Sequence, residues 1–159
     1  MEKKPTLISC GTVSKNRKAH FNYTILETIE AGIVLQGAEV KSLRAGRANI
    51  SEAYASEKDG ALYLNNARIT SLKESGHFRH VEARPRQLLL HKRELNKLLG
   101  LTARKGYTLV PLDIYFNDRG LAKVKLGLAL GKNTVDKRQT VKKREWDREK
   151  RRILTFKNR

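Results

Sequence analysis

The sequence is poor in cysteine, in acidic residues and in long apolar runs. A single cysteine, Cys10, excludes an internal disulfide framework and fits a reducing compartment. No apolar run approaches the roughly 20 residues that a membrane-spanning helix needs, so we expect a soluble, cytoplasmic chain. Asp and Glu number 16 against 34 Lys and Arg, which leaves a net charge of +18. Such a charge calls for a polyanionic partner, usually nucleic acid or an anionic membrane.

Residues 1–14 show no periodic pattern and are expected to be flexible. Within them, the segment 7–10 (LISC) matches the lipobox of bacterial lipoproteins. A signal peptide needs an apolar stretch of about 7–15 residues before its cleavage site. Here only Pro5 and Thr6 separate the box from Lys4. We therefore expect neither a lipid anchor nor a membrane partner.

The positive charge is densest at the C-terminal end. Residues 131–159 hold 12 Lys and Arg and 4 Asp and Glu, a net charge of +8 in 29 residues. Their apolar residues are sparse and do not follow the spacing of a helix face, so this segment cannot bury enough surface to fold alone. It contains good helix formers and no proline. We predict a tail that is disordered when free and helical on RNA, where it would reach about 40 Å at about 1.5 Å per residue.

Residues 15–130 show the alternating apolar pattern of short strands. The pattern predicts strands at 20–29 and 33–35, and a hairpin over 53–65 that turns at Asp59-Gly60. A second hairpin pairs 110–116 with 122–128. Its return strand should point Lys123 and Lys125 away from the core. The expected buried face of its first strand comprises Val110, Leu112, Ile114 and Phe116.

Two short helices are predicted between these strands, at 38–45 and 88–99, each ended by a glycine. In the first helix we expect Glu39, Lys41 and Arg44 to face outward. Short antiparallel strands without βαβ alternation indicate a mainly β fold, a small barrel of the oligonucleotide-binding (OB) type with two or three short helices. The predicted organisation is a flexible N-terminus (1–14), an OB-like barrel (15–130) and a basic tail (131–159).

No catalytic constellation is visible, so we expect no enzyme activity, no cofactor and no metal site. His77 and His80 are interpreted as surface-loop histidines rather than ligands. The segment 127–132 (GLALGK) lacks the spacing of a phosphate-binding loop. Glu27 and Glu30 admit two interpretations, an acid–base pair or strand-end carboxylates that cap a turn or accept hydrogen bonds from RNA. In a strongly basic chain we favour the second.

The aromatic residues also leave two interpretations open. Most are scattered singly, which favours positions in the core or rim of a barrel over a base-stacking platform. Trp146 differs because it lies within the basic tail, far from any predicted core. It would stack on a base or wedge into a groove.

Several motifs occur together along the chain: 30–32 (EAG), 35–51 (LQGAEVKSLRAGRANIS), the Asp59-Gly60 hairpin, 84–95 (RPRQLLLHKREL), Gly106-Tyr107, Gly131-Lys132, 136–138 (DKR) and 142–146 (KKREW). Together they strongly resemble the SsrA-binding protein (small protein B) family of bacterial trans-translation. The resemblance runs from about residue 12 to the end of the chain. The motif at 35–51 is highly specific, whereas the basic tail alone would not be.

The resemblance implies an OB-type barrel that binds transfer-messenger RNA (tmRNA) near the D-arm analogue of its tRNA-like domain. The protein would then occupy the volume of an anticodon stem. It further implies that the tail enters the empty mRNA channel of a stalled ribosome, near the small-subunit RNA, and folds there as a helix. The complex would add a degradation tag to the unfinished chain and release the ribosome. We expect a monomer.

The resemblance also implies site residues. Glu30, with Gly32 shaping its turn, would belong to the RNA-binding surface of the barrel, and Lys41, Arg44 and Asn49 would extend that surface. The implied ribosome-binding residues of the tail are Lys132, Asp136, Lys137, Arg138, Lys142, Lys143, Arg144, Trp146, Arg151 and Arg152.

Two positions depart from the family pattern. Val135 stands where many members carry an aromatic or imidazole side chain, which puts a stacking contact to ribosomal RNA in doubt here. His91 stands where asparagine is common, a milder change.

Two rival functions remain. A permanent ribosomal protein or general translation factor would sediment with all ribosomes, whereas the expected protein is sub-stoichiometric and carries one stable RNA. An RNA-modifying or RNA-cleaving enzyme would lose turnover when its histidines are replaced by alanine.

Overall fold

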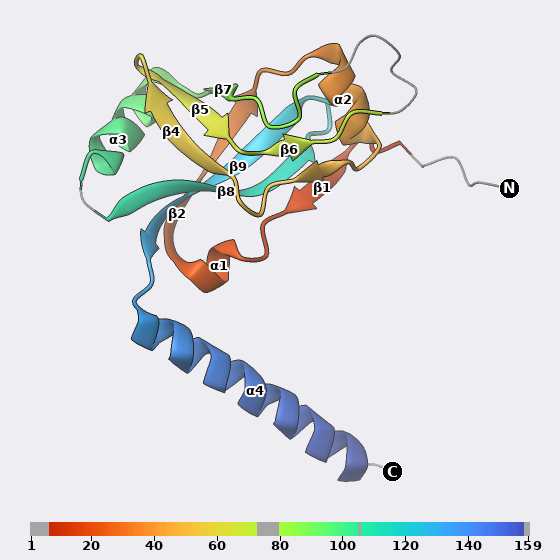
Figure 1. Cartoon of the computed structure of the whole chain (residues 1–159), viewed down its shortest axis with the longest axis vertical. Coiled ribbons are helices and arrows are strands. Elements are labelled where there is room, and N and C mark those ends of the chain that lie inside the picture. Colours follow the sequence, from red (N-terminus) through yellow and green to blue (C-terminus); the bar gives the residue numbers. More distant parts are fainter. Residues whose placement is uncertain (1–6, 73–79, 105, 158–159) are drawn as a thin grey trace, which may run out of the picture.

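The computed structural model describes residues 7–72, 80–104 and 106–157, which form a barrel of strands and a long helix that projects from it (Figure 1). In chain order the elements are β1 (Gly11–Lys15), α1 (Ala19–Asn22), β2 (Tyr23–Ile33), α2 (Gly37–Arg44), β3 (Ala48–Asn49), β4 (Tyr54–Lys58), β5 (Ala61–Asn65), β6 (Arg68–Ile69), β7 (Arg86–Leu89), α3 (Lys92–Thr102), β8 (Tyr107–Phe116), β9 (Ala122–Gly131) and α4 (Thr134–Lys157). The mainly β prediction is confirmed.

The strand pairings close into a ring. Going round it, β8 pairs with β9, β9 with β2, β2 with β7, β7 with β5 and β5 with β4, and Ala55 of β4 returns to Leu109 of β8. The described pairings of this ring are antiparallel. Closure pairs each ring strand with two neighbours and so limits the exposed sheet edges that would otherwise invite aggregation, as in OB-type barrels. β1 adds to β8 beyond the β4 contact, with Gly11 opposite Phe116.

The Asp59-Gly60 hairpin forms as predicted, joining β4 to β5. Both turn residues have positive φ, 52° at Asp59 and 76° at Gly60. These values are the ones that a two-residue turn needs to match the twist of its strands. The second predicted hairpin also forms, between β8 and β9.

The four residues of β8 that were expected to be buried are buried, but the prediction that they share one face is wrong, because the strand contains a bulge. The register with β9 shifts between Pro111 and Asp113, and such a shift reverses the alternation of side chains. Ile114 and Phe116 therefore point into the main core, whereas Val110 and Leu112 form a second apolar cluster. That second cluster contains Ala19, Val110, Leu112 and Ala129.

Three predicted element boundaries are wrong. The expected strand at 20–29 begins at Tyr23, because residues 19–22 form α1. β2 continues through Gly32 to Ile33, so no separate strand exists at 33–35. The expected helix at 88–99 begins only at Lys92, because Leu88 belongs to β7, where it lies opposite Leu62 and Ile33. The helix also continues through Gly100, which was expected to end it.

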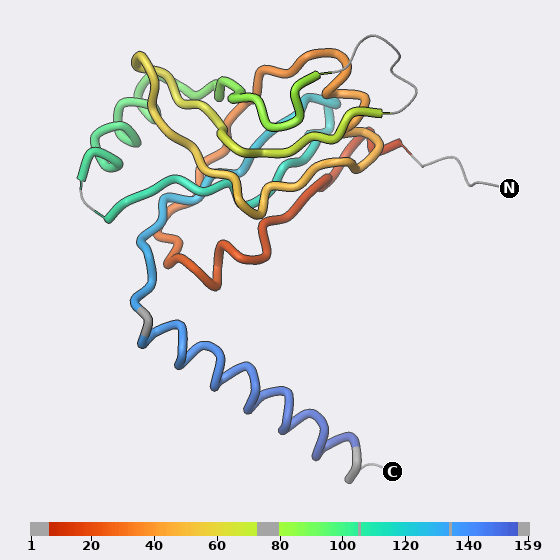
Figure 2. The backbone as a smooth tube through the Cα atoms, in the orientation of Figure 1, coloured from red at the N-terminus to blue at the C-terminus, as the bar shows by residue number. Residues whose placement is uncertain are grey.

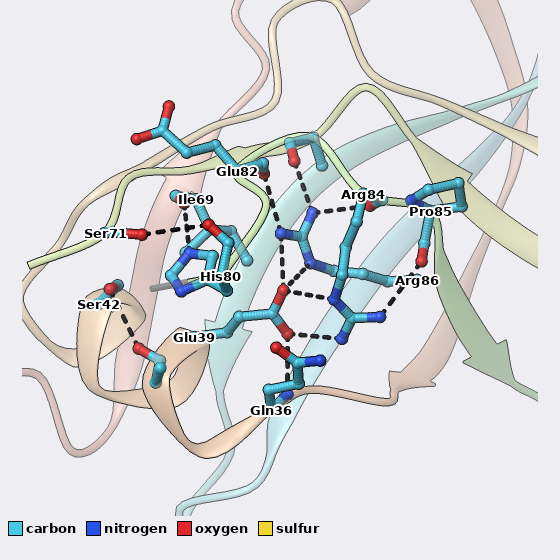
Figure 3. Close-up of polar contacts among 12 residues, drawn as sticks. Gln36, Glu39, Ser42, Ile69, Ser71, His80, Glu82, Arg84, Pro85 and Arg86 are labelled. Carbon is cyan, nitrogen blue, oxygen red and sulfur yellow. Dashed lines mark hydrogen bonds and ion pairs between the residues drawn. The ribbon is translucent and has the colours of Figure 1, made fainter. Parts of the chain in front are cut away.

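The helices close the barrel, and one of them buries an ion network. Leu43 of α2 and Leu98 of α3 are fully buried in the main core. Glu39 of α2 is also fully buried, so the prediction that it faces outward is wrong. Its carboxylate accepts hydrogen bonds from Arg84 Nε (2.8 Å) and Nη2 (2.7 Å) and from Arg86 Nε (2.9 Å), as Figure 3 shows. A buried carboxylate persists only with such partners.

Burial alone would raise the pKa of Glu39. The hydrogen bonds from Arg84, from the Gln36 backbone N–H and from Arg86 outweigh burial and hold the pKa below its ordinary value. Arg86 also donates to the backbone oxygens of Ala67 (2.6 Å) and Glu82 (2.9 Å). The network therefore ties α2 to the segment that leads into β7.

The predicted division of the chain is not settled by this geometry and stays a prediction. β1 begins at Gly11, four residues before the predicted start of the barrel at residue 15. β9 ends at Gly131, where the predicted tail begins. The tube in Figure 2 shows the chain leaving the barrel there and continuing into α4.

Candidate nucleic-acid interface

Glu30 lies near the end of β2, with its side chain 55% exposed on the outside of the barrel. Tyr115 of β8 donates a hydrogen bond from its hydroxyl to Glu30 Oε2. Lys123 of β9 places its Nζ 3.6 Å from Glu30 Oε1. Burial, the hydrogen bond to Glu30 and the nearby carboxylate charges raise the pKa of Tyr115 to about 12. The phenol therefore remains a donor at neutral pH and orients the Glu30 carboxylate.

Gly32 follows two residues later, and the structure corrects the role expected for it. It lies in extended β2 opposite Leu89 of β7, not in a turn. A Cβ atom at this position would lie 3.3 Å from Leu89 Cβ, closer than side chains usually approach. Gly32 therefore lets β2 and β7 come together at the interface.

Glu30 and Gly32 line an open groove of about 610 Å³ on this side of the barrel. Leu89 and Leu121 contribute apolar surface to it and are 54% and 56% exposed. The other lining residues are Ile33, Leu90, His91, Glu94, Ala122 and Lys123. Apolar walls with carboxylates and a lysine suit the faces and edges of unpaired nucleotides.

Leu89, Leu121 and Tyr115 were not predicted as members of this site. One signal was present for Leu89, because β alternation within the leucine triplet turns Leu88 inward and Leu89 outward. Tyr115 and Leu121 lie beside the second hairpin turn, and their place next to Glu30 and Gly32 depends on the β2–β9 and β8–β9 registers. Those registers are long-range features. The prediction that Lys123 and Lys125 point away from the core is confirmed.

The remaining candidate residues of the barrel lie on other elements. Lys41 and Arg44 are exposed on α2. The Arg44 guanidinium lies 5.9 Å from the ring centroid of Phe116, which follows Tyr115 in β8. Asn49 is exposed on β3, where its side chain accepts a hydrogen bond from Ser51 N at 2.9 Å. The groove does not include these three residues, and their part in RNA binding stays a prediction.

The tail leaves the barrel at the opposite end of the β2–β9 ladder. Gly32 pairs with Lys123 at one end and Tyr23 with Gly131 at the other. Lys132 is held by α1: its backbone N–H donates to Asn22 O (3.1 Å) and its Nζ to His20 O (2.9 Å). The structure therefore separates the groove from the root of α4 by the length of the ladder.

α4 carries nine of the ten tail residues implied by the family resemblance. Lys137 is half-buried, and the exposed members are Asp136, Arg138, Lys142, Lys143, Arg144, Trp146, Arg151 and Arg152. Val135, Trp146 and Ile153 are all exposed by about three-fifths. Their spacing of eleven and seven residues places them on one helix face. This sparse apolar stripe was missed because its spacing is longer than that of a packed helix.

One of the histidines expected in a surface loop is buried. His80 is buried, with Nε2 2.6 Å from Ile69 O, so its assignment to the surface is wrong. His77 lies outside the described residues. Within residues 7–72, 80–104 and 106–157, no three His, Cys, Asp or Glu side chains gather as a metal site. The segment 127–131 belongs to β9, which confirms the rejection of a phosphate-binding loop.

The helices of the described part of the chain include none that is long and apolar enough to cross a membrane. The closed antiparallel barrel, its groove and the basic helix instead define an OB-like protein of the nucleic-acid-binding class. A model of the SmpB protein family matches residues 13–156. The chain belongs to this family.

Curated relatives match almost the whole chain. The SsrA-binding protein of Acidiphilium cryptum is 55% identical over 152 residues, which cover 96% of each chain. That of Gluconacetobacter diazotrophicus is 54% identical, covering 96% of this chain and 99% of the relative. A solved structure described as "tmRNA-SmpB: a journey to the center of the bacterial ribosome" is 53% identical with a TM-score of 0.65, covering 76% of this chain and 85% of that one.

Proposed function

We propose that this protein binds tmRNA and delivers it to stalled ribosomes for trans-translation. The observation that carries the proposal is the identity of about 55% to SsrA-binding proteins over nearly the full length of both chains. A related chain of 53% identity belongs to a structure whose description names tmRNA, SmpB and the bacterial ribosome. SsrA RNA is tmRNA, so the two observations point to the same partner.

The barrel groove is the proposed contact with the tRNA-like domain. Glu30 would accept hydrogen bonds from a ribose or a base edge, while Lys123 would meet a phosphate beside it. Leu89 and Leu121 would cover the face of an unpaired base. Lys41, Arg44 and Asn49 would extend the contact along α2 and β3. This combination recognises folded RNA by its shape and exposed loops rather than by duplex sequence.

The tail is the proposed contact with the ribosome. Its ten candidate residues are Lys132, Asp136, Lys137, Arg138, Lys142, Lys143, Arg144, Trp146, Arg151 and Arg152. The basic members would pair with phosphates of small-subunit RNA in the empty mRNA channel. Asp136 to Arg138 would lie in the decoding region, and Trp146 would stack on or wedge between bases.

We further propose that α4 is only partly populated in the free protein and is completed on RNA. Its described side chains are nearly all exposed, and helices in proteins gain most of their stability from packing an apolar face, which α4 largely lacks. Phosphates would neutralise the repulsion along a segment of net charge +8. The tail would then behave as an arm that becomes rigid where it binds.

The proposed role is that of an adaptor rather than an enzyme, working as a monomer in the cytoplasm where ribosomes stall. Two rivals are tested with it. A constitutive ribosomal component would be present on every ribosome. An RNA-processing enzyme would lose its activity when its histidines (His20, His77, His80 and His91) are each replaced by alanine.

The direct test is to purify the tagged protein from its host at moderate salt and to sequence the RNA that remains bound. We expect one abundant RNA with a tRNA-like end and an internal reading frame, present in sub-stoichiometric amounts relative to ribosomes. A random mixture of cellular RNA, or ribosomal RNA at the stoichiometry of a subunit protein, would contradict the proposal.

A further inference from the structure

α1 is a short helix fixed firmly to the outside of the barrel. The Asn16 side chain accepts a hydrogen bond from Ala19 N (3.1 Å) and donates one to Pro111 O (3.1 Å). The Asn16 backbone N–H donates to Leu112 O at 2.8 Å. Ala19 itself is buried in the second apolar cluster, against the bulged part of β8. α1 is therefore tied to β8 by both polar and apolar contacts.

α4 turns one of its faces toward α1. The Arg144 guanidinium lies over the ring of Phe21, 5.3 Å from its centroid. Among the α4 side chains that the structure describes, only Lys137 and Thr140 are half-buried rather than exposed. Figure 1 shows α1 on the side of the barrel that faces the first half of α4. The two helices are in contact there.

The positions on this face follow helical spacing. Lys137, Thr140, Val141 and Arg144 are related as i, i+3, i+4 and i+7, which is a single face of a helix. Of the large apolar residues of α4 whose side chains the structure describes, Val141 is the least exposed, at 39%. Trp146 follows Arg144 by two residues and so lies on the opposite face. The contact therefore leaves the stripe of Val135, Trp146 and Ile153 open to solvent.

α4 is thus attached to α1 at two points. Lys132 holds its root through the two hydrogen bonds to α1. Arg144 lies about 15 Å further along the helix, at about 1.5 Å per residue from Thr134. A single attachment would let the helix pivot, whereas two attachments define its direction.

We propose that Phe21 is a positioning residue that sets the direction in which the tail helix leaves the barrel. It acts through Arg144 and touches neither the RNA groove nor the stripe of the tail. The contact joins an exposed guanidinium to a half-buried ring and is weak, so it is reversible. Arg144 rests on Phe21 before the tail meets RNA and exchanges the ring for a phosphate afterwards. The part of this role that concerns tagging depends on the function proposed above, whereas the direction of the helix does not.

The direction is measured with spin labels on the full-length protein in the absence of RNA. One label sits on Cys10, which is exposed and is the only native cysteine, and the other on Glu149→Cys, exposed on α4. The compared variants are Phe21→Ala, Phe21→Tyr as the matched control that keeps the ring, Arg144→Ala, and Phe21→Ala with Arg144→Ala. Circular dichroism confirms that each barrel is folded. Arg144 lies outside the barrel, so its variant tests the same contact if Phe21→Ala unfolds.

We expect a docked distance population in the wild type and in Phe21→Tyr. A weak cation–π contact of this kind shifts such an equilibrium by about two- to fivefold, so the docked fraction relative to the rest should fall by that factor in Phe21→Ala and in Arg144→Ala. The double variant should lose no more than either single one. Equal docked fractions in the wild type and Phe21→Ala, or additive losses, would overturn the proposal.

Tagging assays on stalled ribosomes then test whether the direction of the tail helix matters for delivery of tmRNA. With Phe21→Ala we expect unchanged tmRNA affinity and a two- to fivefold slower rate of tagging, restored by Phe21→Tyr. Altered distances with a normal tagging rate would refute a role in delivery. Loss of tmRNA affinity in Phe21→Ala would place Phe21 in the RNA-binding surface instead and equally refute the proposal. Absence of tmRNA binding by the wild type would contradict the proposed function and leave the distance measurement to be judged by itself.

Discussion

Glu39 carries a charged side chain that is fully buried in the barrel. It bonds to Arg84 and Arg86, 45 and 47 residues further along the chain. Such partners are invisible to helical periodicity, which placed Glu39 on the outer face of its helix. In the same segment, Leu43 faces the core as helical spacing predicts, and Gly46 follows the end of the helix as expected. Local pattern therefore predicted the helix but not the network that fastens it.

Removing this charge should destabilise the barrel severely. Glu39→Gln leaves the fully buried Arg86 without its counter-ion, and breaking a buried pair in this way costs about 3–5 kcal/mol. Urea unfolding at pH 7 measures the loss. Glu57→Gln, at an exposed position on β4, is the control and should change the unfolding free energy by less than about 0.5 kcal/mol.

The same residue makes stability depend on pH. Because the folded state lowers the pKa of Glu39, its stabilising contribution is fully present above the ordinary value of 4.5 and is lost as the pH falls toward the folded pKa. The unfolding free energy of the wild type should therefore drop more steeply below pH 4.5 than that of Glu39→Gln. Parallel curves for the two proteins would contradict the assignment.

Glu30 tests the groove at the same scale. Charge-assisted hydrogen bonds are worth about 1.5–3 kcal/mol, so Glu30→Ala should weaken tmRNA binding about tenfold or more in gel-shift titrations at fixed salt. Glu27→Ala is the matched control, because Glu27 lies on the same strand but pairs with Lys97 (2.7 Å) outside the groove. Equal effects of the two substitutions, or none from Glu30→Ala, would remove Glu30 from the interface.

Among the elements, those made by local chemistry were predicted well. The residues of the two hairpin turns stabilise the turns by themselves. Asp59 and Gly60 adopt the positive φ that their turn needs. In the turn at 117–120, the Asn117 side chain accepts hydrogen bonds from Arg119 N (3.1 Å) and Leu121 N (2.8 Å). The elements that failed depend on distant partners. The bulge in β8 and the strand at 86–89 are both set by pairing across the barrel, and α1 interrupts a pattern that looks like a continuous strand.

Two glycines with open space around them separate backbone strain from packing. Gly60 has φ of 76°, and an added Cβ would meet no heavy atom within 4 Å. Gly60→Ala should therefore cost about 1–2 kcal/mol through its left-handed conformation alone. Gly100 is equally open but lies inside α3, so Gly100→Ala should stabilise by about 0.8–1.0 kcal/mol. Thermal unfolding measures the change in stability of each variant relative to the wild type. If both substitutions stabilise the protein, or both destabilise it, this account is contradicted.

At the scale of the whole molecule, charge and topology assign different surfaces to different tasks. The groove lies at one end of the β2–β9 ladder and the tail leaves from the other. The charge distribution predicted this division, since net charge is densest after residue 130. Glu30 was a candidate from its residue type in a basic chain, Gly32 was found only through the resemblance of its motif, and the residues that complete the groove required the three-dimensional structure.

The net charge of +18 predicts a steep dependence of RNA binding on salt. Each phosphate contact contributes a slope of about −0.7 to −0.9 in a plot of log affinity against log salt concentration. Replacing Lys123 by alanine should reduce the slope for tmRNA by about one contact. The same slope in wild type and variant would show that Lys123 meets no phosphate.

The division of labour between barrel and tail is tested most directly by ending the chain at Gly131. Every strand of the ring is complete at that residue, so the shortened barrel should fold. The measurement compares tmRNA affinity and tagging on stalled ribosomes for the shortened and full-length proteins. We predict tmRNA affinity within a few-fold of the full chain together with loss of tagging, whereas tagging by the shortened protein would contradict the account.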